Sequence, residues 1–274
     1  MSCIAVLMTV HNRKSETLKS LKSLLLQRVN VDIYLVDDGC TDGTSEAVKT
    51  MFPSVHIING NGKLFWNRGM ILAWETAASK KDYDFYMWLN DDTCLNTSSI
   101  DELMNCSEKE HHKSIICGTT CSPDNNATYT YGGWKLKSTF VKPNGQIQYC
   151  DYFNGNIVLI PKYVYAIVGT NDPLFRHALG DFDYGLRARK AGIKSVVTPH
   201  VLGVCSDHES FAGWCNTKTP ILKRLKLLYS PLGNDPIEFF RYDFRHNGIL
   251  IATFHFFTIH LRAIIPHFWK DRKK

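Results

Sequence analysis

The chain has 274 residues, of which 44% are hydrophobic and 21% are charged, and its net charge is +6. A chain of this length and apolar content buries a full hydrophobic core, which excludes a disordered protein. Its nine cysteines include no Cys-x-x-Cys pair, which argues against a disulfide framework and a structural zinc site and favours a reducing compartment. Because the N-terminus lacks the basic start and cleavage site of a signal peptide, we expect a cytoplasmic protein.

The first part of the chain alternates between strand and helix patterns. Short apolar runs predict strands, and apolar residues at helical spacing behind polar caps predict helices. The expected strands are residues 4–10, 31–36, 55–58 and 85–89, and the expected helices start near Ser15, Thr44 and Met70. Repeated βα units predict an α/β fold with a doubly wound, mostly parallel sheet that has helices on both faces. The functional loops should collect at one edge of this sheet.

Two adjacent carboxylates follow the most apolar strand. Residues 85–89 run directly into Asn90-Asp91-Asp92-Thr93. Ligands of open α/β sheets bind outside the carboxyl ends of the strands, and hard cations such as Mg²⁺ use one or two carboxylates together with substrate phosphates. The pair therefore predicts a site for a divalent metal and phosphates. The alternative is a solvated acidic turn, which is common after strands.

Two more acidic clusters follow predicted strands or precede a helix. Asp37 and Asp38 end the second strand, and Asp181 and Asp183 stand at the start of a short predicted helix that ends near Gly192. A carboxylate after the second strand can accept hydrogen bonds from a base or a ribose. The alternatives are an Asx turn in the first cluster and a helix cap at Asp181. We expect all three clusters to converge on one edge of the sheet.

The basic charge belongs to the C-terminal segment. Residues 214–274 hold eleven Lys and Arg against four Asp and Glu, which leaves the rest of the chain near neutral. The segment contains apolar runs at 249–254 and 264–269, but His255, His260 and Arg262 interrupt it. It is therefore too polar for a membrane-spanning helix and suits an interfacial amphipathic helix. The segment either lies against an anionic membrane or packs on the main domain with a solvated basic end. No recognition motif accompanies the basic residues, so we expect no nucleic-acid partner.

Four ordered motifs give the chain a family resemblance. They are residues 4–13 (IAVLMTVHNR), 36–44 (VDDGCTDGT), 88–93 (WLNDDT) and 180–183 (GDFD). Together they closely resemble a family 2 glycosyltransferase with the GT-A fold, over about residues 3–205. Residues 62–70 and the basic aromatic tail look like the rhamnosyltransferase-like branch used in bacterial surface polysaccharide assembly, such as O-antigen or capsule.

The resemblance implies a donor site. It assigns nucleotide contacts to Thr9, Asn12 and Asp37, assistance to Asp38, donor phosphates to Arg68, and a ribose or phosphate contact to Asp91. Asp92 resembles the metal ligand, although Asn90 replaces the usual first acid of the Asp-x-Asp motif. His208 is a candidate additional ligand, and its alternative role is structural. The implied cofactor is Mn²⁺ or Mg²⁺, and the implied donor is a sugar nucleotide based on UDP, dTDP or GDP.

The resemblance also implies a catalytic base and an acceptor site. Asp181 matches the base of the family's Glu-Asp motif, although Gly180 stands at the Glu position. Trp134 and Asn154, in turn-like surroundings, and Asp183 beside the base are the acceptor-site candidates, and Trp66 is a candidate wall of the donor pocket. For the aromatic residues of this region, packing in the core is the alternative.

These expectations combine into one functional hypothesis with two rivals. We expect a GT-A domain over residues 1–213, with a nucleotide-sugar half at about 1–95 and an acceptor half at about 96–213, and a helical extension over 214–274. It would be an inverting, metal-dependent hexosyl or deoxyhexosyl transferase that acts on a glycan or lipid-linked glycan, peripherally at the inner face of the cytoplasmic membrane. The rivals are a sugar nucleotidyltransferase, whose glycine-rich basic loop the first strand lacks, and a non-catalytic nucleotide- or sugar-binding module.

Overall fold

The computed structural model describes residues 2–206 and 213–267, and the chain divides into two compact units. The first unit comprises Met1–Pro173 and Gly180–Asp207, and the second comprises Leu174–Leu179 and His208–Lys274. The sequence-based boundary after residue 213 lies near this division. The segment Leu174–Leu179 differs from the expectation, because it belongs to the second unit and not to the acceptor half.

A nine-stranded sheet forms the centre of the first unit. Its strands are β1 (Ile4–Val10), β2 (Val31–Asp37), β3 (His56–Asn59), β4 (Phe85–Leu89), β5 (Cys94–Leu95), β6 (Ile115–Cys121), β9 (Gln148–Cys150), β11 (Ile157–Pro161) and β12 (Ser195–Val204). The order is β3-β2-β1-β4-β11-β6-β12-β5, and β9 pairs with β12. β1 to β4 run parallel, whereas β11 lies antiparallel between β4 and β6. The prediction of a mostly parallel sheet is confirmed.

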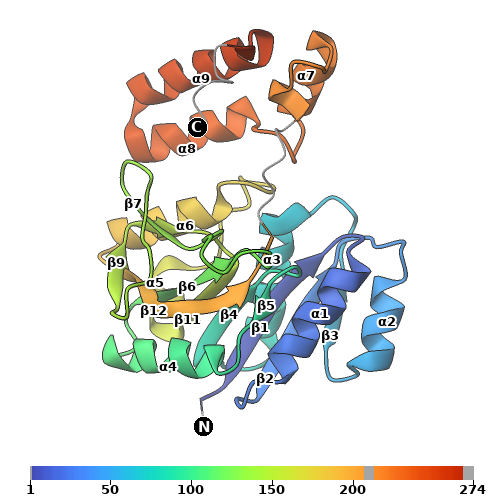
Figure 1. Ribbon diagram of the computed structural model, residues 1–274, viewed down its shortest axis with the longest axis vertical. Helices are drawn as coiled ribbons and strands as arrows, with labels where there is room; N and C mark the ends of the chain where they lie inside the picture. The colour runs from blue at the N-terminus through green and yellow to red at the C-terminus, as the bar shows by residue number, and fades with distance from the viewer. Residues whose placement is uncertain (1, 207–212, 268–274) are drawn as a thin grey trace. The chain divides into compact units, whose positions relative to one another are not determined.

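Helices cover both faces of this sheet (Figure 1). One face packs against α1 (Lys14–Leu25), α2 (Thr44–Met51) and α4 (Ser99–Lys109), and the other against α3 (Phe65–Lys80), α5 (Lys162–Val168) and α6 (Gly180–Lys190). Side chains alternate between the two cores along each strand: Met87 faces α1 and α4, whereas Trp88 faces α3 and α6. This two-sided burial explains why the strands are apolar at nearly every position.

The strand order places a topological switch point between β1 and β4. From β1 the chain builds outward through β2 to β3, and it then returns to place β4 on the other side of β1. Ligands of open α/β sheets bind in the crevice at such a point, outside the carboxyl ends of the strands. The segments that follow β1 and β4 are therefore where the fold positions a ligand.

A small second sheet and a helical second unit complete the structure. The small sheet contains β7 (Gly133–Lys135), β8 (Thr139–Phe140) and β10 (Tyr152–Phe153), in the order β10-β7-β8. The second unit contains a short 3₁₀ helix, Gly213–Cys215, followed by α7 (Ile221–Leu228), α8 (Pro236–Asn247) and α9 (Ile249–Ile264). Within the described ranges, no helix has the length and apolar character needed to cross a bilayer.

Candidate active site

The acidic pair and one arginine meet at the switch point. Asp91 and Asp92 follow β4, and Arg13 lies between β1 and α1. The guanidinium Nη2 of Arg13 is 2.8 Å from Asp92 Oδ2, and Nη1 is 3.7 Å from Asp91 Oδ1. Although burial disfavours the charged guanidinium, the charges of Asp91 and Asp92 raise the pKa of Arg13. Arg13 ends the first sequence motif and was not among the predicted site residues.

Asp91 is the deeper of the two carboxylates. It is 7% exposed, and its Oδ2 is buried with no hydrogen-bond partner among the described residues. Burial raises the pKa of Asp91 to about 7, and the negative charge of Asp92 adds to this shift while Arg13 opposes it. A buried carboxylate oxygen without a partner is costly, and a cation or a donor would satisfy it.

The acidic pair fits a hard divalent cation that shares its coordination with phosphates. Carboxylate oxygens are the ligands such cations prefer, and Mg²⁺ needs only one or two of them beside substrate phosphates. Within residues 2–206 and 213–267, no group of three or more His, Cys, Asp or Glu could hold a metal on its own. His208, the candidate additional ligand, lies outside the described residues.

Asp37 is held in its ionised form at the end of β2. Burial works against its charge, but hydrogen bonds from the Ser45 hydroxyl and from the Cys40 amide, 2.6 Å from Oδ1, outweigh it and lower the pKa of Asp37. Asn12, at a positive φ of 52° after β1, accepts a 2.7 Å hydrogen bond from the Thr41 amide. The loops after β1 and β2 are therefore joined beside the switch point.

Asp38 has a structural task that the sequence did not reveal. The carboxylate is 3% exposed and accepts 2.8–2.9 Å hydrogen bonds from three backbone amides, those of Gly62, Leu64 and Phe65. These bonds anchor the loop that leads into α3. The expectation that Asp38 assists nucleotide binding conflicts with this arrangement, because both oxygens are turned inward to the chain.

Thr9 and Arg68 both contact neighbouring backbone. Thr9 is 8% exposed, and a Cβ at Gly69 would lie 2.2 Å from its hydroxyl oxygen, so β1 and α3 approach closely there. Arg68 donates from Nε to the Pro173 carbonyl oxygen at 2.9 Å. Both residues lie near the start of α3, and their predicted contacts with the nucleotide stay predictions.

Asp181 lies in the first turn of α6 and is oriented by backbone amides. Its Oδ2 accepts a hydrogen bond from the Gly155 amide and its Oδ1 from the Phe182 amide, both at 2.9 Å. Burial raises the pKa of Asp181 to about 6, and these backbone hydrogen bonds oppose the shift. The carboxylate is therefore ionised at neutral pH, close to the point at which it exchanges a proton.

Trp66 joins the acidic segment to the segment around Asp181. Its indole Nε1 donates to Asn90 Oδ1 at 2.7 Å. Its ring lies against Gly155, where a Cβ would be 2.4 Å from Cζ2 of the indole. The amide of Asn90 also donates to the Asn156 carbonyl at 3.1 Å. The segment after β4 and the Gly155 loop that orients Asp181 therefore lie together at one edge of the sheet, as expected.

Packing explains why residue 180 is a glycine and not a glutamate. A Cβ at Gly180 would lie 2.0 Å from Oδ1 of Asn67, so the Asn67 side chain fills the space that a longer residue at 180 would need. Asn67 is fully buried, donates to the Asp172 carbonyl oxygen and accepts from the Asn171 amide group, both at 2.8 Å. Sequence reasoning missed Asn67, and no signal in its local pattern marks it.

Two of the three acceptor-site candidates contact each other near Asp181. Trp134, in β7, donates from its indole to Asn154 Oδ1 at 2.8 Å, and Asn154 directly precedes Gly155. Asp183 is different: it is 0% exposed and forms a 2.8 Å ion pair with Arg187 inside α6. The prediction that Asp183 binds the acceptor conflicts with this burial, because a substrate cannot reach the carboxylate.

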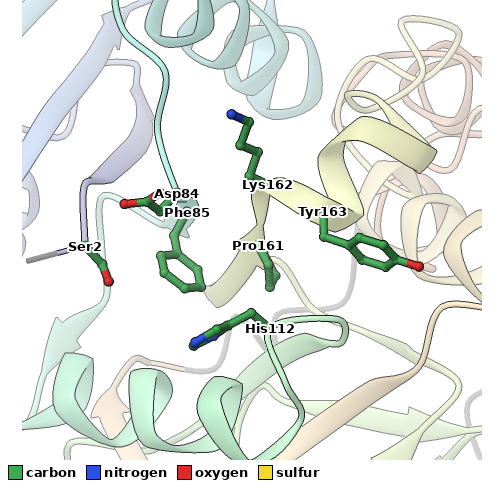
Figure 2. A pocket seen from close by; sticks show the side chains of 7 residues that line it. All are labelled: Ser2, Asp84, Phe85, His112, Pro161, Lys162 and Tyr163. Carbon is green, nitrogen blue, oxygen red and sulfur yellow. The ribbon is translucent and has the colours of Figure 1, made fainter.

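A cavity of about 490 Å³ lies away from the candidate active site (Figure 2). It is lined by Ser2, Asp84, Phe85, His112, Pro161, Lys162 and Tyr163. Phe85 begins β4 and Pro161 ends the antiparallel β11, so this cavity is at the amino ends of the parallel strands. None of the predicted site residues lines it, and we do not assign it to the reaction.

Comparison with known proteins agrees with the motifs and the strand order. Two solved structures of S. aureus TarS share the fold at 11% sequence identity. The first has a TM-score of 0.56 and covers 87% of this chain, and the second, of residues 1–349, has a TM-score of 0.54 and covers 100%. This chain spans 44% of the first TarS chain and 74% of the second.

No curated protein matches the sequence. The family model of Glycosyl transferase family 2 matches residues 5–165, more than half of the chain. The chain therefore belongs to glycosyl transferase family 2.

Proposed function

We propose that this glycosyltransferase moves a sugar, with inversion, from a nucleoside-diphosphate sugar to a glycan or lipid-linked glycan. The observation that carries the proposal is the meeting of two kinds of carboxylate at one sheet edge. Asp91 and Asp92 stand at the switch point, and Asp181 is linked to them through Gly155, Trp66 and Asn90. Inverting transfer needs a leaving-group site and a base that flank the same sugar.

The donor would bind at the acidic side of this edge. Asp37, Asn12 and Thr9 are the proposed nucleotide contacts, since they line the ends of β1 and β2 beside the switch point. Asp91 and Asp92 would hold Mn²⁺ or Mg²⁺, which neutralises the charge that develops on the leaving diphosphate. The Arg13 guanidinium, which is part-exposed beside both carboxylates, is a second positive group within reach of the phosphates.

Asp181 is the proposed general base. As the acceptor hydroxyl oxygen attacks the anomeric carbon, its proton passes to the Asp181 carboxylate, and the bond to the nucleoside diphosphate breaks on the opposite side. The amides of Gly155 and Phe182 fix both carboxylate oxygens, so the base is oriented before the acceptor arrives. A base with a pKa near the working pH accepts a proton efficiently and also releases it.

Trp134 and Asn154 are the proposed acceptor contacts. They hydrogen-bond to each other next to Gly155, so an acceptor that contacts them would reach Asp181. An indole offers an apolar face, and an amide offers both a donor and an acceptor, a combination that suits a sugar ring.

The acceptor class and the place of action are further parts of the proposal. The motifs at residues 62–70 and the basic tail support a role in bacterial surface polysaccharide, O-antigen or capsule, with a deoxyhexose such as rhamnose, or a hexose, as the sugar. A lipid-linked acceptor would place the enzyme at the inner face of the cytoplasmic membrane. We therefore propose peripheral contact with anionic lipid through residues 214–274.

A turnover assay tests the proposal against its rivals. UDP-, dTDP- and GDP-sugars are incubated with a lipid-linked glycan acceptor and Mn²⁺, and release of the nucleoside diphosphate is measured. We expect release with one donor, loss of release in Asp181→Asn, and no change in Asp124→Asn, which alters an exposed loop carboxylate. Release of pyrophosphate from a nucleoside triphosphate would instead identify a nucleotidyltransferase. Nucleotide binding without any turnover would favour a binding module.

A further inference from the structure

Helix α9 of the second unit carries a continuous apolar stripe on its surface. Its members recur at spacings of four and three residues, which places them on one face of a helix. They are Leu250, Phe254, Phe257, Leu261 and Ile264, with exposed fractions of 84%, 63%, 67%, 45% and 45%. Apolar side chains that are exposed singly are ordinary, but five in one row mark an interaction surface.

The stripe is exposed although the opposite face of α9 is well packed. Ala252 and Ala263 on that face are fully buried, and the ring of Phe256 meets that of Phe240 from α8 at 5.9 Å. Tyr229 and His260 share a 2.7 Å hydrogen bond that ties α9 to the end of α7. The orientation of the helix within its unit is therefore fixed by contacts on one side, which leaves the stripe on the other.

Among residues 213–267 of the second unit, the acidic side chains are buried or partly buried and the exposed charged side chains are basic. Residues 213–267 contain seven Lys and Arg and three Asp and Glu. The three acids are turned inward: Asp235 and Glu238 both bind Arg176, and Asp243 binds His255. Their side chains are 11%, 11% and 5% exposed. The exposed charged residues of this range are all basic, namely Lys218, Lys223, Lys226 and Arg241.

We propose that the α9 stripe inserts into the surface of a bilayer that contains anionic lipid. An apolar row on a unit whose exposed charges, among residues 174–179 and 213–267, are all positive matches the two chemistries of such a surface, acyl chains and anionic headgroups. At 16 residues, α9 is about 24 Å long and would lie in the interface, not across the bilayer. This proposal rests on the membrane contact proposed above for residues 214–274 and assigns that contact to one face of α9. It does not depend on the active-site assignments.

The chief competing occupant is a second copy of the chain. Two second units that met through their stripes would bring surfaces of the same positive sign together, which disfavours association at low salt. An anionic bilayer has the opposite sign, and each Lys or Arg near such a surface contributes about 1 kcal/mol of attraction. Charge therefore favours the bilayer over the second copy.

Co-sedimentation of the full chain with vesicles tests the proposal. Vesicles of phosphatidylcholine alone are compared with vesicles that also contain phosphatidylglycerol. We expect at least about tenfold tighter binding to the anionic vesicles, and a loss of at least about tenfold when Leu250, Phe254 and Phe257 are all changed to Gln. The control changes Leu26, Met51 and Ile167, exposed apolar residues of the first unit, to Gln and should bind as the wild type does.

Three outcomes would overturn the inference. The first is equal binding of the stripe variant and the wild type. The second is equal binding of the wild type to both kinds of vesicle. The third is a wild-type dimer by sedimentation equilibrium that the stripe variant abolishes without any change in lipid binding, which would assign the stripe to a second copy. Circular dichroism establishes that the variants fold, and turnover of a detergent-dispersed acceptor tests the active site separately.

Discussion

Replacing Asp181 by Asn should make the protein's stability less sensitive to pH while it removes activity. Burial raises the pKa of Asp181 from 3.8 to about 6, so the folded protein disfavours the ionised carboxylate relative to the unfolded chain. The stability linked to this group is therefore present in full below pH 3.8 and is lost as the pH rises through about 6. Asn does not titrate, so the free energy of unfolding of the variant does not contain this pH-dependent decrease.

The size of the effect follows from the two pKa values. The difference between 3.8 and about 6 corresponds to about 3 kcal/mol over the whole titration. About 1.4 kcal/mol of it falls between pH 5 and pH 8, because the unfolded carboxyl is already ionised at pH 5. Asn keeps only one of the two backbone hydrogen bonds that Asp181 accepts, which costs about 1–2 kcal/mol at every pH.

The assay is urea unfolding of wild type and variant at several pH values between 5 and 8. Other titrating groups are common to both proteins, so their effects cancel in the difference. We expect the free energy of unfolding of the variant to rise relative to the wild type by about 1.4 kcal/mol across this range. A difference that stays constant between pH 5 and pH 8 would refute the raised pKa of Asp181.

The same group sets the pH dependence of activity. If Asp181 is the base, wild-type turnover should fall about tenfold for each pH unit below about 6. The Asn variant should lose about 10²- to 10⁴-fold in kcat and should bind the nucleotide as the wild type does. Lost nucleotide binding would place Asp181 in the donor site and not at the acceptor.

Three other substitutions probe the arrangement around the site. Asp38→Ala removes the acceptor of three backbone amides before α3 and should lower the free energy of unfolding by about 2–4 kcal/mol in urea titrations; an unchanged value would contradict its anchoring role. Gly155→Ala places a Cβ 2.4 Å from the Trp66 ring, so kcat should fall while calorimetry finds nucleotide binding intact. Arg13→Gln leaves Asp91 without its nearby cation, so thermal melts should show destabilisation of about 1–2 kcal/mol at neutral pH. Mn²⁺ should raise Tm more in this variant than in Lys22→Gln, a charge-matched control in α1, the helix that Arg13 precedes. Equal Mn²⁺ effects in both would argue against a cation site at the acidic pair.

The strands of the first unit were predictable because burial on both faces leaves a plain signal. Residues 4–10 and 85–89 are strands with the predicted bounds, and the helix expected near Met70 exists. That helix starts earlier, at Phe65, because its first amides are held by Asp38 from the end of β2. A cap supplied by a distant segment leaves no mark in the local sequence, so the start could not be read from it.

The sequence predicts the carboxylates of the candidate site, but it does not predict the residues that bind them. Asp37, Asp91 and Asp92 follow strands, and a parallel sheet brings strand ends together, so the convergence of these three acids follows from the order of the elements. The direction of a side chain at a helix start does not follow from order: Asp181 is held by the Gly155 loop, whereas Asp183, two residues later, points into the core and binds Arg187. Asn67, which occupies the space beside Gly180, required the packing of α3 against α6 to be known.

Binding of nucleoside diphosphates tests the central claim most directly. UDP, GDP and dTDP are titrated by calorimetry, each with and without Mn²⁺, into the wild-type chain, into Asp92→Asn, and into Asp101→Asn as a charge-matched control in α4. We predict that one nucleotide binds in a Mn²⁺-dependent manner to the wild type and the control, and more weakly to Asp92→Asn. The absence of binding by all three nucleotides under both conditions would contradict the assignment of the switch point between β1 and β4 as a nucleotide-sugar site.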